Sequence, residues 1–515
     1  MARSRRILQI IFLLLFAALF LLARYPYETG ISSDIFLRFS PLPPLFHFLD
    51  NFTIPGWFWP ALVILFLTLF LGRFFCGWIC PLGTSLDLFN RLFKSPSNKI
   101  SEKWVKLRWL KYGILTAAII LAVFSINAWG FLDPLAIFTR LTISIFYPTF
   151  TLLIEGFLIL FSKIPFAQSF SYSLFDWFKT YLMPESQAYY QGLAGLFALT
   201  VVIFGLERFA RRFWCRYICP AGALFALFSQ ARFYERLVSE SCPVCNRCQV
   251  ECKMNAIPGE KVHETNKAEC IECFNCGEKC PPKAKSITYR FRWRPYHSKP
   301  DFSRRQFITT SASSILAVGL ISLGMKDRTS SAKNIRPPGS LPENEFLDRC
   351  LRCLECVRIC SSNGKCLQPV GFEQNLLELW TPVASMREGY CEYNCNLCGL
   401  VCPTDAILPL PLALKKQTPM GLAYFDKNLC IPFARHEDCL VCEEHCPTPD
   451  KAIKFDLKMA QLPDGSSRMV KYPYVVRELC IGCGICEHKC PLPALPGVLV
   501  TRENEKRLLT VPPAV

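Results

Sequence analysis

Two cysteine runs between residues 242 and 280 constrain the fold of this chain more than any other feature. They read C-P-V-C-N-R-C-Q-V-E-C and C-I-E-C-F-N-C-G-E-K-C-P, so both have the spacing C-x2-C-x2-C-x3-C. This spacing holds a pair of [4Fe–4S] clusters, and the fourth cysteine of each run ligates the cluster of the other run. The predicted ligand sets are Cys242, Cys245, Cys248 and Cys280 for one cluster, and Cys270, Cys273, Cys276 and Cys252 for the other.

Four more cysteine groups follow beyond residue 342. Their sixteen thiolates suit four further [4Fe–4S] clusters, which brings the expected number to six. The spacing before the second cysteine widens to x3 in the second group and to x8 in the third, which predicts short insertions there. The groups are Cys350, Cys353, Cys356 and Cys360; Cys391, Cys395, Cys398 and Cys402; Cys430, Cys439, Cys442 and Cys446; and Cys480, Cys483, Cys486 and Cys490.

The first of these groups departs from the others at its end. A proline follows the last cysteine of the other three groups, whereas Ser361 follows Cys360. Together with the nearby Cys366, this leaves the fourth ligand of the group open, and the spacing favours Cys360. Structural zinc is the competing interpretation of all these cysteines. Zinc sites rarely repeat three cysteines at x2-x2 with a fourth at x3, so we expect iron–sulfur clusters.

Two shorter motifs form an internal repeat in the first half of the chain. They are C-G-W-I-C-P, with Cys76 and Cys80, and C-R-Y-I-C-P, with Cys215 and Cys219. A small-residue step and an apolar stretch follow each one. Three interpretations stay open: the four cysteines ligate one additional metal centre, form redox-active thiols, or are structural cysteines at helix ends.

The composition separates metal ligation from disulfide bonding. The chain has 29 cysteines, but disulfide-rich secreted proteins are small and rarely show such repeated blocks, so ligation is the better account. Apolar residues make up 51% of the 515 residues, which is high for a soluble protein. The formal net charge is +17. Because Lys and Arg gather at the ends of apolar runs, this charge follows the positive-inside rule and does not indicate nucleic acid.

Four apolar stretches in the first half have the length of a membrane-spanning helix, about 20 residues. They lie near 7–23, 57–75, 110–129 and 192–209. The basic start M-A-R-S-R-R, with no A-x-A cleavage site after the first stretch, favours an uncleaved span with its N-terminus in the cytoplasm. The basic segments 91–111 and 207–216 are then cytoplasmic too, and both C-x3-C-P motifs lie at the cytoplasmic membrane edge.

Two other apolar stretches need separate interpretations. The stretch 142–161 is long enough to cross, but Pro148 and Glu155 are costly in lipid, so we expect an outer-face or re-entrant helix. A moderately apolar run follows the twin arginines of S-R-R-Q-F at 303. It predicts either a fifth membrane anchor or an uncleaved twin-arginine export signal. Both place the domain that follows outside the cytoplasm.

These features divide the chain into five parts. Residues 1–234 are expected to form a polytopic membrane domain, and 235–292 a cytoplasmic two-cluster ferredoxin domain. Residues 293–342 carry the twin-arginine-like segment, the fifth span and a linker. Residues 343–505 are expected to form an extracytoplasmic four-cluster domain, and 506–515 a C-terminal tail. The expected fold class is an α-helical membrane domain with small α+β ferredoxin domains of the bacterial type.

The motifs resemble two known families. The C-x3-C-P pair, the stretch G-F-L-D-P-L at 130–135 and the first two cysteine runs resemble the NapH/MauN-type membrane ferredoxins, which are quinol dehydrogenase subunits. The twin-arginine segment and the four later groups resemble the NapG/MauM-type periplasmic ferredoxins. The chain thus looks like a fusion of the two. The resemblance implies that the first cysteine group shares its two clusters with the fourth group, and the second with the third.

The function expected from these features is electron transfer. Thiolate-held clusters exchange single electrons, and the chain has no G-x-G-x-x-G loop for a dinucleotide and no histidine pair in a predicted span for a haem. We expect a quinol dehydrogenase-type subunit of an anaerobic respiratory chain, in the cytoplasmic membrane, with no catalytic residues and no quinone ligands that the sequence identifies. Its partners would be the quinone pool and a redox enzyme or multihaem cytochrome. A metalloenzyme maturation factor and a docking scaffold with structural clusters remain alternatives.

Overall fold

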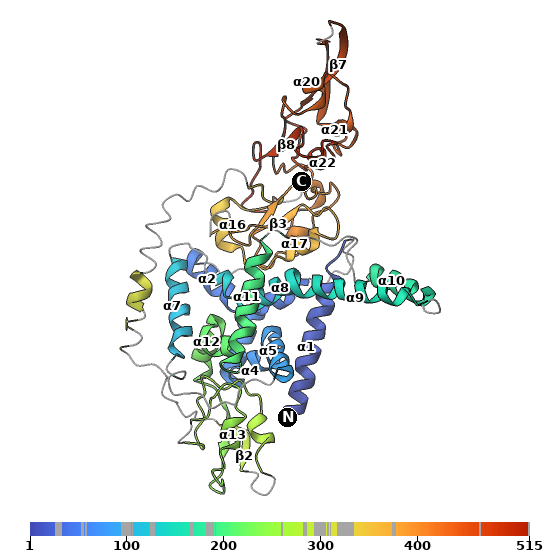
Figure 1. Cartoon of the computed structure of the whole chain (residues 1–515). Helices are drawn as coiled ribbons and strands as arrows, with labels where there is room; N and C mark the ends of the chain where they lie inside the picture. Colours follow the sequence, from blue (N-terminus) through green and yellow to red (C-terminus); the bar gives the residue numbers. More distant parts are fainter. Residues whose placement is uncertain are drawn as a thin grey trace. The chain divides into compact units, whose positions relative to one another are not determined.

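The computed structural model describes residues 1–512 except 26–32, 53–55, 57–58, 94–104, 106, 124–128, 165–167, 182–189, 191, 259–260, 282–285, 293–304, 306–307, 310, 317–333, 373–376 and 463–464. The chain folds into two compact units (Figure 1). The first unit comprises Met1–Leu22, Ser33–Thr142 and Ala194–Asp327. The second comprises Ala23–Ser32, Ile143–Leu193 and Arg328–Val515.

Helices dominate the first unit. Each of the four apolar stretches at 7–23, 57–75, 110–129 and 192–209 contains a helix: α1 (Ala2–Leu22), α3 (Trp59–Leu71), α7 (Trp109–Val123) and α11 (Leu193–Gly205). Of these four, α1 alone has the length of a membrane span in the described residues, and crossing by the other three stays a prediction. Shorter helices lie between them: η1 (Ser33–Phe39), α2 (Leu42–Asn51), α4 (Phe74–Trp78), α5 (Pro81–Leu92), η3 (Trp129–Phe131) and α8 (Pro134–Leu141). Three more follow α11: η6 (Leu206–Arg208), η7 (Trp214–Ile218) and α12 (Pro220–Ser229).

Two described helices are long and apolar enough to cross a membrane by length and composition. One is α1, and the other is the continuous helical run Pro134–Ser162, of 29 residues. This run joins α8, the π-helical segment η4 (Thr142–Phe146) and α9 (Tyr147–Ser162). The stretch 142–161 is therefore helical throughout, and whether it crosses or lies at the outer face stays a prediction. Most of the expected fifth span after residue 303 lies outside the described residues.

The stretch G-F-L-D-P-L begins one of these helices. Asp133 is the N-cap residue of α8, and its carboxylate accepts hydrogen bonds from the backbone N–H groups of Leu135 and Ala136 at 3.1 and 2.9 Å. Pro134 occupies the first helical position, where its missing N–H costs no hydrogen bond. Ser40 donates a further hydrogen bond to the buried Asp133. These contacts give the motif a helix-capping role.

A small α+β segment of ferredoxin type completes the first unit. Strand β1 (Tyr234–Val238) pairs antiparallel with β2 (Ile287–Phe291), so the two ends of the segment lie together. Between them in sequence are two one-turn helices, α13 (Arg247–Val250) and α14 (Asn275–Glu278), of which Figure 1 labels α13. The core of the segment contains Cys248, Ile257 and Val262.

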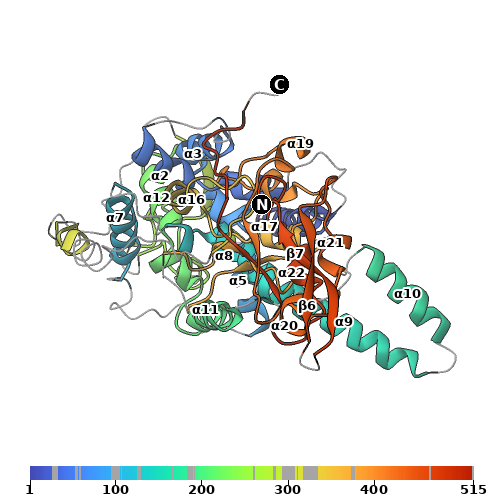
Figure 2. The same ribbon diagram turned by 90° about the horizontal axis from the view of Figure 1, so that it is seen from above.

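The second unit contains α9, α10 (Gln168–Tyr181) and a larger ferredoxin-type region. The described residues of this region form three two-stranded antiparallel sheets, and the β6–β7 hairpin is the longest of them (Figure 2). The elements of the region are α16 (Glu343–Arg349), α17 (Glu355–Cys360), β3 (Leu367–Pro369), β4 (Pro382–Ala384), α18 (Leu397–Leu400), α19 (Leu412–Lys415), β5 (Leu422–Phe425), α20 (Ile431–Arg435), α21 (Val441–Glu444), β6 (Ile453–Gln461), β7 (Ser467–Val475), α22 (Ile485–His488) and β8 (Val498–Thr501).

Candidate metal centres

The two C-x3-C-P motifs fold in the same way. In each, the first cysteine lies in a short helical segment, Cys76 in α4 and Cys215 in η7. The second cysteine is the N-cap of the helix that follows, Cys80 for α5 and Cys219 for α12. The proline then takes the first helical position, where its fixed φ favours helix initiation. The internal repeat of the sequence is thus a structural repeat.

The structure brings the four cysteines of the repeat together. Cys80, Cys215 and Cys219 are buried. Burial raises the pKa of the Cys80 and Cys219 thiols well above the usual value and that of Cys215 to about 12, and charges on neighbouring cysteines raise these pKa values further. Cys76 is one of these neighbours in all three cases. Three buried thiols of this kind become stable thiolates only beside a cation, so the donor set that they form with Cys76 fits a metal centre.

Two arginines join the halves of the repeat reciprocally. Arg212 donates hydrogen bonds to the carbonyl oxygens of Cys76 and Gly83 at 2.7 and 2.9 Å. Arg73 donates to the carbonyl oxygen of Cys215 at 3.3 Å. Each arginine stands three residues before the first cysteine of its own motif and binds the other motif. The sequence prediction treated the basic segment around Arg212 only as a topology signal. The shared pattern R-x2-C-x3-C-P-x-G was the signal that could have identified both residues.

The charges of these arginines are compensated by buried carboxylates. Asp87 lies 2.9 Å from Arg212 and 2.8 Å from Lys253, and Arg5 approaches it at 3.6 Å. Burial alone would raise the pKa of Asp87, but Arg212, Lys253 and Arg5 outweigh it and hold that pKa well below the usual range. Asp87 is therefore ionised at neutral pH. Arg73 pairs in the same way with the buried Glu269 at 3.1 Å, and Lys111 also contacts that carboxylate.

The repeat touches the first ferredoxin-type segment directly. Gly77 lies so close to it that a Cβ there would be 2.2 Å from the carbonyl oxygen of Ile271. The next residue, Trp78, donates its indole N–H to the carbonyl oxygen of Glu272 at 3.0 Å. Gly77 and Trp78 stand between Cys76 and Cys80, while Ile271 and Glu272 stand between Cys270 and Cys273. Two cysteine motifs from distant parts of the sequence are therefore in backbone contact.

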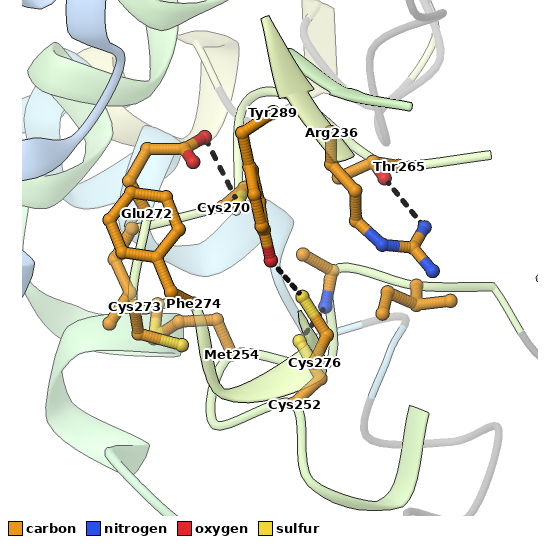
Figure 3. A pocket seen from close by; sticks show the side chains of 13 residues that line it. Arg236, Cys252, Met254, Thr265, Cys270, Glu272, Cys273, Phe274, Cys276 and Tyr289 are labelled. Carbon is orange, nitrogen blue, oxygen red and sulfur yellow. Dashed lines mark hydrogen bonds between the residues drawn. The ribbon is translucent and has the colours of Figure 1, made fainter. Parts of the chain in front are cut away.

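One cavity of the first ferredoxin-type segment is lined by a predicted ligand set. Its walls include Cys252, Cys270, Cys273 and Cys276 (Figure 3). These are three cysteines of the second run and the fourth cysteine of the first run, as the spacing predicts. The Tyr289 hydroxyl lies 2.9 Å from the Cys276 sulfur, and the backbone N–H of Ala256 donates to the Cys252 sulfur at 3.2 Å. Hydrogen bonds of this kind stabilise ligating thiolates.

For the other predicted ligand set of this segment, the structure brings three of the four cysteines together. Cys242 and Cys245 lie near enough to Cys248 for their charges to raise the pKa of its thiol, which burial raises first. The Arg236 guanidinium lies 3.5 Å from the Cys248 sulfur. The place of Cys280 in this set stays a prediction.

The four cysteine groups of the larger ferredoxin-type region, which is called the last domain below, do not pair as the resemblance implied. The resemblance paired the first group with the fourth and the second with the third. One cavity is lined by Cys391, Cys395 and Cys398 of the second group and by Cys360 of the first. Another is lined by Cys480, Cys483 and Cys486 of the fourth group and by Cys446 of the third. The first group therefore pairs with the second, and the third with the fourth.

The two complementary sets agree with this pairing. Cys353 and Cys356 lie close enough to Cys402 for their charges to interact. In the same way, Cys430 and Cys442 interact with Cys490. The physical reason is proximity along the chain, because α17 packs against α18 and α21 packs against α22. The wide spacing within the third group accommodates α20, an insertion that the sequence predicted.

The serine that replaces proline after the first group has a structural explanation. Helix α17 has six residues, whereas α18, α21 and α22 have four each. The backbone N–H of Ser361 donates to the carbonyl oxygen of Val357 at 3.0 Å. A proline lacks this N–H, so it would remove the hydrogen bond that extends the helix through Cys360.

Within the described part of the chain, no three His, Cys, Asp or Glu side chains are arranged closely enough to hold a single metal ion. A four-iron cube keeps its cysteine ligands farther apart than one ion does. Sets of four cysteines around a common cavity, with backbone N–H groups directed at the sulfurs, fit the larger group.

Comparison with known proteins agrees with this chemistry. Two family models described as 4Fe-4S binding domains match the chain, one at residues 53–99 and 191–238 and the other at 473–495. The ferredoxin-type protein NapG of Escherichia coli is 33% identical over 202 residues, which are 38% of this chain and 84% of NapG. The methylamine utilization ferredoxin-type protein MauM of Methylorubrum extorquens is 32% identical over 37% of this chain and 85% of MauM. The chain belongs to the NapG/MauM family of ferredoxin-type proteins.

The first matched segments of the 4Fe-4S model contain both C-x3-C-P motifs, which sequence spacing alone left open. The putative electron transport protein YccM of Escherichia coli is 28% identical over half of this chain and 60% of YccM. No solved structure matches the chain significantly. This NapG/MauM-type chain is thus an iron–sulfur electron-transfer protein that binds [4Fe–4S] clusters.

Proposed function

We propose that this protein is a multi-pass protein of the cytoplasmic membrane that passes electrons between the quinone pool and a redox partner, as a quinol dehydrogenase-type subunit. It joins a NapH/MauN-type membrane part to a NapG/MauM-type ferredoxin part. The N-terminus and the first ferredoxin-type segment lie in the cytoplasm, and the last domain lies outside it. The length and apolar composition of α1, and the apolar composition of the shorter helices α3 and α7, support a membrane location for the first part of the chain.

The cysteine geometry supports the following six ligand sets. When bound, each [4Fe–4S] cluster takes up and releases one electron. The sets are Cys242, Cys245, Cys248 and Cys280; Cys252, Cys270, Cys273 and Cys276; Cys350, Cys353, Cys356 and Cys402; Cys360, Cys391, Cys395 and Cys398; Cys430, Cys439, Cys442 and Cys490; and Cys446, Cys480, Cys483 and Cys486. Cys76, Cys80, Cys215 and Cys219 form a seventh set.

The observation that carries the proposal is the contact of Gly77 and Trp78 with the loop between Cys270 and Cys273. Through this contact, the loop of one cysteine motif in the repeat packs on the loop of a cysteine motif in the first ferredoxin-type segment. Cysteine groups of the last domain are in direct contact as well. The backbone N–H of Cys391 donates to the carbonyl oxygen of Cys483 at 2.8 Å, which joins the second and fourth cysteine groups. Each part of the chain thus holds its cysteine sets in direct succession.

The test uses purified full-length protein kept anaerobic. Iron and acid-labile sulfide per chain are measured first, and EPR spectra are then recorded during stepwise addition of a menaquinol analogue. About 28 irons per chain are expected for seven [4Fe–4S] clusters, and about 24 if the C-x3-C-P cysteines hold none. Partial reduction by the quinol supports the proposal. If the iron content is complete but the quinol reduces none of the clusters, the quinol dehydrogenase hypothesis is refuted and a protein electron donor is favoured. Zinc in place of iron refutes electron transfer itself.

The maturation-factor alternative predicts a different result in the same preparation. It requires copper or free, reactive thiols at Cys76 and Cys80. Those thiols would react with an alkylating reagent without loss of iron, whereas ligating thiolates would not.

A further inference from the structure

One cavity of the last domain is lined by five cysteines. Cys391, Cys395, Cys398, Cys360 and Cys366 all contribute to its walls. A [4Fe–4S] cluster takes four cysteine ligands. The cavity around Cys480 and the one around Cys270 in the first unit have four each. This cavity therefore has one more sulfur than its cluster needs.

The two candidates for the fourth ligand lie side by side. The sulfurs of Cys360 and Cys366 are 3.9 Å apart. Cys366 is buried, with 2% of its surface exposed, and lies near enough to Cys391 and Cys398 for their charges to interact. Its thiol therefore faces the same cavity as the three undisputed cysteines.

The chain supports these two cysteines independently. Cys360 ends helix α17, whereas Cys366 immediately precedes strand β3. The backbone carbonyl oxygen of Cys366 accepts a hydrogen bond from the backbone N–H of Ser385 at 2.7 Å. The loop between them is closed by a hydrogen bond from the Lys365 N–H to the Cys360 carbonyl oxygen at 2.9 Å. The loop is also packed tightly, because a Cβ at Gly364 would lie 2.1 Å from the Tyr390 carbonyl oxygen.

The second and third groups have a hydroxyl beside the sulfur of their fourth cysteine. The Thr448 hydroxyl lies 3.2 Å from the Cys446 sulfur, and that of Thr404 lies 3.9 Å from the Cys402 sulfur. A hydroxyl donates a hydrogen bond to a thiolate but ligates iron poorly, whereas a thiolate is the preferred ligand. In the first group, the neighbour of the fourth cysteine is the sulfur of Cys366 instead of a hydroxyl.

We propose that Cys366 is an alternative fourth ligand of the cluster held by Cys391, Cys395 and Cys398, interchangeable with Cys360. This inference rests on the proposed assignment of a [4Fe–4S] cluster to the cavity. In the exchange, the bond from iron to the Cys360 sulfur breaks and a bond to the Cys366 sulfur forms. Cys366 releases its proton, Cys360 takes one up, and no electron moves. The exchange allows the cluster to survive loss or oxidation of one of the two sulfurs.

The test compares Cys360→Ala with Cys402→Ala in the full-length protein. Cys402 is the matched control, because it is the fourth ligand of the neighbouring set and has Thr404 beside it. We expect C360A to keep the wild-type iron and sulfide content, and C402A and the double variant C360A/C366A to lose one cluster each, about four irons. Native mass spectrometry of the anaerobic protein counts the clusters. If C360A loses a cluster as C402A does, the inference is wrong.

A second measurement does not depend on removing Cys360. The rate at which an iron chelator extracts iron is compared for wild type, Cys366→Ala and Thr404→Ala. If Cys366 is an alternative ligand, one cluster in C366A should lose its iron severalfold faster than in wild type, and T404A should lose iron at the wild-type rate. Equal rates in wild type and C366A would refute the inference. A wild-type protein that binds no [4Fe–4S] cluster would instead refute the proposed function on which it rests.

Discussion

Replacing Gly77 by alanine tests whether the backbone contact between the repeat and the first ferredoxin-type segment matters. The added Cβ would lie 2.2 Å from the Ile271 carbonyl oxygen, whereas real Cβ contacts are essentially never shorter than 3.0 Å. The two backbones must therefore separate by about 0.8 Å or more. Overpacking of this kind costs about 1–3 kcal/mol. Movement of the loop also strains the Trp78 hydrogen bond to Glu272, which is worth about 1 kcal/mol.

The assay is the temperature at which the anaerobic protein loses the visible absorption of its clusters. With roughly 2–4 °C per kcal/mol for domains of comparable size, G77A should lower this temperature by roughly 2–12 °C. The matched control is Gly205→Ala, because nothing lies within 4 Å of a Cβ at that helical position. G205A should leave the temperature unchanged or raise it slightly, since alanine favours a helix over glycine by about 0.5–1 kcal/mol.

The same pair of variants tests electron transfer at this contact. G77A that keeps its iron should show slower reduction by quinol of the clusters in the first ferredoxin-type segment than G205A. A G77A protein that matches G205A in thermal behaviour and in reduction rate would show that the close approach of Gly77 and Ile271 contributes neither to stability nor to electron transfer.

The remaining predictions concern buried charge. Arg212→Met removes an ion pair of Asp87 and the hydrogen bonds to two carbonyl oxygens. It should therefore destabilise the first unit by about 3–5 kcal/mol, measured by thermal cluster loss. The control variant Arg211→Met should change this stability little. Asp87→Asn should also destabilise. Because the pKa of Asp87 is depressed in the folded protein, its contribution is fully present above the unfolded value of about 3.9 and declines as pH falls below it. The stability gap between wild type and D87N should therefore narrow from pH 5 to pH 3, and a constant gap would contradict the ion-pair assignment. In the second unit, Arg336→Met should cost about 3–5 kcal/mol, because it removes the buried partner of Glu343 and Glu378.

Spacing alone grouped four cysteines of the first ferredoxin-type segment that the structure places around one cavity. Cys252 joins Cys270, Cys273 and Cys276 around one cavity because the x3 step turns the fourth cysteine of each run toward the partner run. The four apolar helices were also predictable, since length and hydropathy determine them without tertiary information.

The pairing in the last domain could not be read from spacing. All four groups contain the same ligand types, so each pairing satisfies the same pattern, and only the packing of α17 on α18 and of α21 on α22 selects between them. The role of Ser361 was hidden for a related reason. A missing proline signals only that the local turn differs, while the longer helix that uses the Ser361 N–H is visible in the structure alone.

The reciprocal arginines explain why the C-x3-C-P motif occurs twice. Each motif supplies two thiols and one arginine, and each arginine hydrogen-bonds a carbonyl oxygen of the other motif. With one motif alone, Arg212 would lose the carbonyl oxygens of Cys76 and Gly83, whereas Arg73 would lose that of Cys215 but keep its ion pair with Glu269. Folding of both motifs together therefore satisfies both buried arginines. It follows that Arg73→Met should disturb Cys215 and Cys219, on the far side of the sequence, as strongly as Cys76 and Cys80.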